Sequence, residues 1–227
     1  MRTVLAALAA RRHPVLRWED GDGAALELTG PVLANWVHKA HGLLADLDVG
    51  PHRGLGLVVG ADEPLHWRAL AGALAAWGLG SPVLLVTDEP PADEWIALVP
   101  EALAQDPVTD SADEVLVFPV APLALAADAP PETIDFATAL RAFPDESAIA
   151  ASPRVTLGEA AAPQTVQLAE LTAGGPSGDP TGRSSDTTAE AAVSTEVALT
   201  SAPRTAGDWT RVLDGLLQGL LVLRPAD

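Results

Sequence analysis

The sequence predicts an α/β protein with a mainly parallel sheet flanked by helices. Residues 55–59 and 82–87 are short apolar runs that begin after or at a Gly or Pro, as buried strands do. An amphipathic helical pattern from about residue 63 to 77 lies between them, and strand, helix and strand in this order form a right-handed crossover with parallel strands. Hydrophobic residues make up 48% of the 227-residue chain, which is enough for a substantial core.

The first fifty residues predict a helix, a hairpin and a second helix. The apolar run 4–10 precedes Arg11 and Arg12, the reverse of a secretory signal peptide, so it predicts an amphipathic helix that stops before Pro14. Residues 15–18 and 25–28 are apolar runs on either side of an Asp-Gly-Asp-Gly turn, a pattern typical of a β-hairpin. Thr29 then predicts the N-cap of a helix whose apolar residues recur at helical spacing as far as residue 47.

The rest of the chain shows less regular patterns. They predict strands at residues 115–120, 165–171, 196–201 and 220–223, helices at 134–143 and 209–217, and a connection at 144–163. We expect a single domain over residues 1–227, with a Gly-, Pro-, Ser- and Thr-rich loop region at about 172–195. Trp36, Trp67 and Trp77 lie among leucines and alanines at helical spacing, which indicates core positions.

Charge excludes several classes of function. The chain carries 31 acidic and 13 basic side chains, a formal charge of -18, and Lys39 is its one lysine. This excludes a nucleic-acid binder, which needs clustered Lys and Arg, and it disfavours acidic membranes. There is no cysteine, which excludes disulfides and Cys-ligated zinc and predicts a reducing, cytoplasmic location. The sequence contains no run of about 20 apolar residues, so no membrane-spanning helix is predicted.

The middle of the chain is strongly acidic. Between residues 69 and 140 there are twelve carboxylates and no Lys, Arg or His, so no side chain there can neutralise a phosphate. The run 88–114 lacks the ligand spacing of a calcium loop, and a solvated face is the better interpretation. His38, His41 and His66 could in principle share a metal ion, but no carboxylate completes a recognisable metal-binding spacing. We therefore expect these histidines to pack between helices or to face solvent.

The segment 172–183 is the one stretch that is similar to a phosphate cradle. Its glycines allow backbone N–H groups to approach oxyanions, and its hydroxyl groups add donors. It is not a Walker A sequence, and a plain surface loop is the alternative interpretation. The candidate nucleotide-binding residues are Thr172, Gly174, Gly175, Ser177, Gly178, Thr181, Gly182 and Arg183. No catalytic residue is predicted, and there is no G-x-S-x-G elbow.

The order and spacing of several segments resemble the N-terminal part of adenylate-forming enzymes, the AMP-binding and acyl-CoA synthetase-like superfamily, and in particular short actinobacterial proteins that match only that part. Residues 49–55, Val-Gly-Pro-His-Arg-Gly-Leu, stand where the family has V-G-P-G-D-R-V. Residues 171–178 fall where the family has its T-S-G-T-T-G-x-P-K-G phosphate loop, and residues 209–223 are similar to a later helix and strand. The other matching segments are Trp18-Glu19-Asp20-Gly21, Leu28-Thr29, Gly78-Leu79-Gly80 and Pro82-Val83.

The resemblance implies ATP or AMP with Mg²⁺, and an acyl group, as ligands, but the sequence departs from the family pattern. The phosphate-loop position has no lysine, and Thr181-Gly182 is displaced. The family's adenine-binding motif, acidic ribose-binding residue and C-terminal catalytic lysine have no counterpart here. We therefore expect a non-catalytic, truncated relative that binds a ligand or a protein partner; the alternative is an enzyme that retains a nucleotide or acyl half-site. A third possibility is an acidic module that binds a basic partner.

Overall fold

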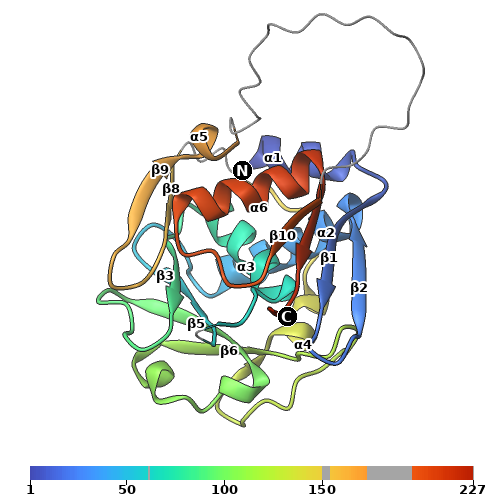
Figure 1. Ribbon diagram of the computed structural model, residues 1–227. Helices are drawn as coiled ribbons and strands as arrows, with labels where there is room; N and C mark the ends of the chain where they lie inside the picture. Colours follow the sequence, from blue (N-terminus) through green and yellow to red (C-terminus); the bar gives the residue numbers. More distant parts are fainter. Residues whose placement is uncertain (61, 150–153, 173–195, 227) are drawn as a thin grey trace, which may run out of the picture.

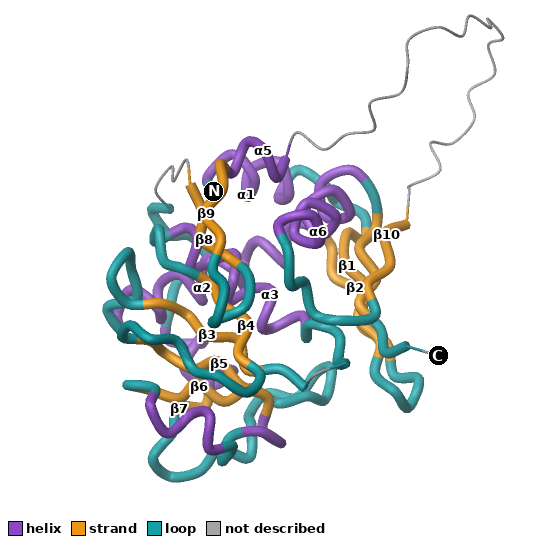
Figure 2. Tube along the Cα trace, turned by 60° about the vertical axis from the view of Figure 1, so that its left-hand side comes forward, coloured by secondary structure: helices purple, strands orange, loops and turns teal. Residues whose placement is uncertain are grey.

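The computed structural model describes residues 1–60, 62–149, 154–172 and 196–226, and it confirms the predicted α/β class. Two larger sheets lie on either side of a buried helix, α3 (Trp67–Gly78), as Figures 1 and 2 show. All twelve residues of α3 are buried. No helix in the described part of the chain is long and apolar enough to span a membrane.

The first sheet has four strands in the order β10-β11-β1-β2. Its predicted hairpin joins β1 (Pro14–Glu19) to β2 (Ala25–Thr29), and the Asp20 carboxylate closes the turn by accepting hydrogen bonds from the N–H groups of Asp22 and Ala24. The predicted strands β10 (Glu196–Leu199) and β11 (Leu220–Leu223) lie parallel to each other, and β11 lies parallel to β1. Segments from both ends of the chain therefore share this sheet.

The second sheet has five parallel strands in the order β4-β3-β5-β6-β7. The predicted crossover from β3 (Gly54–Val58) through α3 to β4 (Val83–Val86) is confirmed. The chain then crosses to the other side of β3 and continues with β5 (Trp95–Pro100), β6 (Glu114–Phe118) and the two-residue β7 (Ile134–Asp135). The order of the strands thus reverses between β3 and β5.

Strand β5 corrects the expectation that residues 88–114 form only a solvated face. Many of the carboxylates are exposed as expected, but Trp95 is only 1% exposed and β5 lies in the middle of the sheet. Gly56 of β3 makes this possible, because a Cβ there would come within 2.3 Å of the Trp95 ring. The short 3-10 helices η1 (Glu101–Leu103) and η2 (Pro107–Ser111) contribute to a second core on this side of the sheet.

Helices cover the remaining apolar surface. The predicted helices α1 (Arg2–Ala9), α2 (Gly30–Asp46) and α6 (Ala206–Gln218) are confirmed. Helix α2 packs against α3, and α6 packs against the first sheet (Figure 1). Thr29 is the N-cap residue of α2 as expected, but its side chain makes no capping hydrogen bond.

Three expected elements differ from the structure. Helix α3 begins at Trp67, four residues later than the pattern predicts, because the ring of His66 caps it. The expected helix 134–143 is β7 followed by α4 (Phe136–Ala139) and the 3-10 turn η3 (Leu140–Ala142). The expected strand 165–171 is β9 (Gln164–Gln167) followed by α5 (Leu168–Thr172), and β9 pairs with β8 (Arg154–Leu157), which lies in the expected connection.

Candidate functional site

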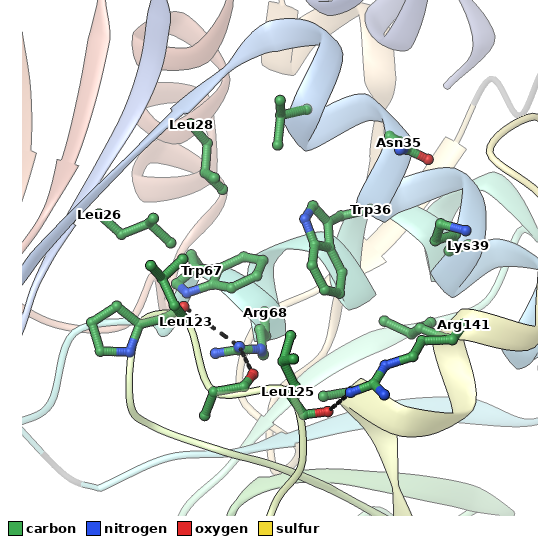
Figure 3. Close-up of a pocket in the computed structure, with 15 residues that line it drawn as sticks. Leu26, Leu28, Asn35, Trp36, Lys39, Trp67, Arg68, Leu123, Leu125 and Arg141 are labelled. Carbon is green, nitrogen blue, oxygen red and sulfur yellow. Dashed lines mark hydrogen bonds between the residues drawn. The ribbon is translucent and has the colours of Figure 1, made fainter.

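A cavity of about 460 Å³ lies between β2, α2, α3, α4 and the loop that follows β6 (Figure 3). We call it the Trp36–Trp67 cavity. The helical spacing on α2 brings Trp36 to the edge of the core, and Trp67 is the first residue of α3. The two indole rings meet edge to face, with 5.1 Å between ring centroids. Further apolar walls are supplied by Leu26, Leu28, Ala137 and Leu140.

The rim of this cavity is unusually apolar for an exposed surface. Val32, Leu123 and Leu125 are 43%, 76% and 69% exposed, and they are the large hydrophobic residues that are exposed in the described part of the chain. All three line the Trp36–Trp67 cavity. Apolar side chains that gather at one concave place on a surface indicate a binding site, whereas scattered ones do not.

Three cations line the same cavity: Lys39, Arg68 and Arg141. The Lys39 ammonium lies 2.7 Å from a carboxylate oxygen of Asp145 and donates to the carbonyl of Phe143. Arg141 donates to the carbonyl of Leu125. Among the described residues that line the cavity there is no carboxylate, although the chain as a whole has 31. The described lining of the cavity therefore carries positive charge on a strongly negative molecule.

Arg68 fixes the loop that closes the cavity. Its guanidinium donates hydrogen bonds to the carbonyl groups of Pro119, Ala121, Pro122 and Ala124 at 2.7–3.5 Å, of which Figure 3 draws the last two. It lies 4.3 Å from the centre of the Trp67 ring. Burial lowers the pKa of Arg68 to about 10, against the opposing influence of Glu101 and Asp135, so the group stays charged at neutral pH. The backbone of residues 119–124 is thus tied to α3 by one buried side chain.

Some polar atoms in the walls have no protein partner. Five buried side-chain atoms in the described residues lack a hydrogen bond, and three belong to this lining: Asn35 Oδ1, Trp67 Nε1 and Arg68 Nε. A buried donor or acceptor left unpaired costs about 1–3 kcal/mol, so native proteins contain few of them. Their concentration in the lining of one cavity distinguishes it from ordinary core.

A second cavity, also of about 460 Å³, lies at the carboxyl ends of β1, β3, β5 and β6. We call it the carboxyl-end cavity. It lies where the strand order reverses between β3 and β5, the place at which open parallel sheets bind ligands. Carboxylates line it, namely Glu19, Asp20, Asp62 and Glu63, and among its described lining residues there is no Lys or Arg.

His66 forms part of the wall of the carboxyl-end cavity. Its Nδ1 accepts the N–H of Arg68, and its Nε2 lies 3.2 Å from the carbonyl of Val120, an arrangement that places the ring proton on Nε2. The ring packs on Phe118, with 4.8 Å between centroids, and against the edge of Trp18. Burial, and next the charge of Arg68, lower the pKa of His66 to about 3. The imidazole is therefore neutral at pH 7 and does not offset the carboxylates.

Of the nucleotide-binding residues proposed from the sequence, the structure describes only Thr172. Thr172 ends α5, and its hydroxyl donates to the carbonyl of Leu168. Gly174, Gly175, Ser177, Gly178, Thr181, Gly182 and Arg183 lie outside the described residues. Thr172 lines neither of the two cavities.

The three histidines considered as metal ligands, His38, His41 and His66, have separate contacts. His38 Nδ1 lies 3.0 Å from the Ser147 hydroxyl, His41 is buried against Gly78 of α3, and His66 caps α3. Within the described ranges, no group of three His, Cys, Asp or Glu side chains is placed to hold a metal ion. The helix-packing interpretation therefore accounts for His41, whereas His66 caps α3 and packs on strand residues.

Comparison with known sequences gives one partial relative. No protein-family model matches the chain. A Mycobacterium tuberculosis protein, named only as a member of a numbered family, is 31% identical over 134 residues. That match covers 57% of this chain and 53% of the other protein, so the two chains are aligned over about half of their lengths.

Comparison with solved structures identifies the fold. An acyl-CoA synthetase from Brucella canis matches with a TM-score of 0.64 and 16% identity, over 99% of this chain and 43% of that one. The acetoacetyl-CoA synthetase from Streptomyces lividans matches with a TM-score of 0.65 and 18% identity, over 99% and 38%. The N-terminal domain of FACL13 from Mycobacterium tuberculosis matches with a TM-score of 0.54 and 13% identity, over 99% and 57%. The chain thus has the fold of an N-terminal portion of acyl-CoA synthetase-like enzymes, as the sequence resemblance predicts.

Proposed function

We propose that this chain is a non-catalytic relative of the AMP-binding, acyl-CoA synthetase-like enzymes, which uses its share of their fold to bind a ligand or a partner. The observation that carries the proposal is the charge of the carboxyl-end cavity. Four carboxylates and a neutral His66 line the place where a parallel sheet ordinarily binds its ligand. A location in the cytoplasm fits the absence of cysteine.

Adenylation requires the opposite electrostatics. An enzyme that transfers an adenylyl group stabilises the charge that develops on the phosphates with Lys, Arg, Mg²⁺ or backbone N–H groups, and this stabilisation supplies much of the rate. The phosphates of ATP in the carboxyl-end cavity would face Glu19, Asp20, Asp62 and Glu63 in a chain of charge -18. Lys39 and Arg68 line the other cavity instead.

Pyrophosphate exchange tests this proposal. The purified chain is incubated with ATP, Mg²⁺, labelled pyrophosphate and a panel of alkyl and aryl carboxylates. We expect no carboxylate-dependent exchange above that of a heat-denatured sample, because the described lining of the carboxyl-end cavity offers the phosphates no Lys or Arg. Reproducible carboxylate-dependent exchange would overturn the proposal.

A second candidate function is a residual nucleotide or acyl half-site at Thr172 to Arg183. Its support is the position of residues 171–178, which coincides with the family's phosphate loop in the sequence resemblance. This candidate predicts a saturable, Mg²⁺-dependent heat on titration with ATP or AMP, which the double variant Gly174→Val and Gly175→Val abolishes. No heat at high nucleotide concentration counts against it.

A third candidate is an acidic module that binds a basic partner, supported by the charge of -18. Association of this kind weakens steeply as salt screens the charges. A pull-down with basic proteins at low and at high salt separates this candidate from the other two, since neither of those predicts a steep loss of partner with salt.

A further inference from the structure

We propose that the Trp36–Trp67 cavity is a binding site for a small aromatic anion: a molecule with an aryl body and one carboxylate, sulfonate or phosphate group. Its aryl body packs between Trp36, Trp67 and the aliphatic walls, and its anionic group lies toward Lys39 and Arg141. Figure 3 shows these two cations at one end of the cavity and Leu26, Leu28 and Leu123 at the other. The proposal rests on the binding role proposed above, but not on the absence of adenylation.

The walls suit an aryl group. A volume of about 460 Å³ lies within the range of roughly 300–1,000 Å³ that small-molecule pockets occupy. Aromatic rings prefer offset or edge-to-face contacts, and the perpendicular Trp36 and Trp67 rings present both a face and an edge to a third ring. Burial of Leu123 and Leu125 by a ligand removes exposed apolar surface from water, which favours association.

The cations in the lining favour a ligand with a negative charge. The chain repels anions at long range, so an anion binds only where local cations outweigh the field of the whole molecule. Lys39, Arg68 and Arg141 create such a place, because the carboxylates that act on them, Asp145 at Lys39 and Glu101 and Asp135 at Arg68, lie outside the described lining. The Asp145 carboxylate that pairs with Lys39 is 67% exposed, and such surface ion pairs are weak enough for a ligand to compete with them.

The unpaired polar atoms provide independent support. The side chains of Trp67 and Arg68 are 2% and 1% exposed, and each has a ring or guanidinium N–H without an acceptor in the cavity lining. Since the anionic group of the ligand lies toward Lys39 and Arg141, the acceptor for these donors is a polar atom on the aryl body. Because these atoms are covered, we expect the side chains of Leu123 and Leu125 to shift when the ligand enters.

The occupant is a small molecule and not a protein chain. A stable protein interface buries about 800 Å² on each partner, with several apolar anchors. Here three exposed apolar side chains surround a concave opening, and two of them belong to a loop that Arg68 holds in place. This geometry matches a pocket with a rim more closely than a docking face.

The experiment compares two fluorescent probes with the same aromatic skeleton. 8-Anilinonaphthalene-1-sulfonate carries one negative charge, and N-phenyl-1-naphthylamine is neutral. Each is titrated into the full chain, and both probe emission and energy transfer from tryptophan are recorded. We expect one saturable site per chain that binds the sulfonate more tightly than the neutral probe.

Variants assign the site. Lys39→Gln and Arg141→Gln should each weaken sulfonate binding on the order of threefold to tenfold, and should leave the neutral probe unchanged. Arg12→Gln removes the same charge from an exposed position outside the cavity and should affect neither probe. Leu125→Gln changes a 69% exposed side chain, so it preserves the fold and should weaken both probes.

Several results would overturn the proposal. They are equal affinities for the two probes, equal effects of Arg141→Gln and Arg12→Gln, and binding that does not saturate near one site per chain. Probe-independent self-association through the leucine rim, detected by sedimentation, would identify a protein contact instead. If the wild-type chain neither binds the sulfonate nor catalyses pyrophosphate exchange, this site alone is refuted. If it binds the sulfonate and also catalyses exchange, the non-catalytic role alone is refuted.

Discussion

His66 connects three parts of the molecule through one imidazole ring. The ring caps α3 at the Arg68 N–H, contacts the carbonyl of Val120 in the loop after β6, and packs between Trp18 and Phe118 of the two sheets. A charged ring in this position would lack solvent and would lie beside the Arg68 guanidinium. The neutral form is therefore the one that the folded state accommodates.

Protonation of His66 should make stability depend on pH. The unfolded chain binds a proton at this residue below about pH 6.5, whereas the pKa in the folded state is about 3. Between these values the unfolded state holds more protons, so the free energy of unfolding rises with pH by up to about 1.4 kcal/mol per pH unit and levels off above pH 6.5. We expect urea denaturation between pH 4.5 and 7.5 to show this slope.

The variant His66→Asn isolates this effect. Asn keeps a side-chain oxygen that can accept the Arg68 N–H at the helix terminus, but it does not titrate. The stability difference between the wild-type chain and this variant should shrink as the pH falls from 6.5 to 4.5. His13→Asn, at an exposed position, is the matched control and should keep the wild-type slope. A constant difference between wild type and His66→Asn would contradict the prediction.

Arg68 shows why one residue of the cavity was beyond sequence reasoning. Its position in an apolar helix gives no indication that the guanidinium binds four carbonyl groups of a loop more than fifty residues later in the chain. Trp36 and Trp67 were predicted as core residues, and Trp67 is one. Trp36 is partly buried: it packs against the core on one side and lines the cavity on the other.

The helix N-termini differ in how they are capped. Helix α6 begins with a capping box, in which the Thr205 hydroxyl accepts the Asp208 N–H and the Asp208 carboxylate accepts the Thr205 N–H. Thr29 occupies the same position at α2 without a side-chain capping bond. Two threonines at equivalent helix positions therefore have different expected contributions to stability.

Alanine substitutions at these caps should separate the two cases. Thr205→Ala removes an acceptor from the first turn of α6 and should lower the free energy of unfolding by about 1 kcal/mol. Thr29→Ala removes no capping bond and should change it by less than about 0.5 kcal/mol. Urea denaturation of both variants measures the difference. Equal losses would show that the cap geometry is not the source of the effect.

Elements with strong periodicity were predictable, and elements defined by distant contacts were not. Helix α2 and the β1–β2 hairpin follow from spacing and turn residues alone. Strand β5 is a six-residue run inside an acidic segment, and its central place depends on the space that Gly56 leaves for Trp95. The segment 165–171 carries a strand pattern at first, but Leu168 and Leu171 are both buried three residues apart, which is a helical spacing.

At the scale of the whole molecule, one hydrophobic core joins the two sheets. Leu16 and Leu221 of the first sheet and Leu55, Leu98 and Leu116 of the second belong to the same cluster of buried side chains, with α3 between the sheets. The cluster also includes residues of α1, α2 and α6. Because the two sheets share one core on the faces that point toward α3, we propose that residues 1–227 form a single domain.

The unfolding cooperativity of the chain tests this proposal. Leu221→Ala in β11 and Leu98→Ala in β5 each remove a side chain that is 0% exposed, one from each sheet, and each should cost about 2–5 kcal/mol. If the shared core makes the sheets interdependent, circular dichroism and tryptophan fluorescence will report one coincident urea transition. Both variants will then shift its midpoint without changing its slope. If the sheets unfold separately, two transitions will appear and each variant will move only the one that belongs to its own sheet.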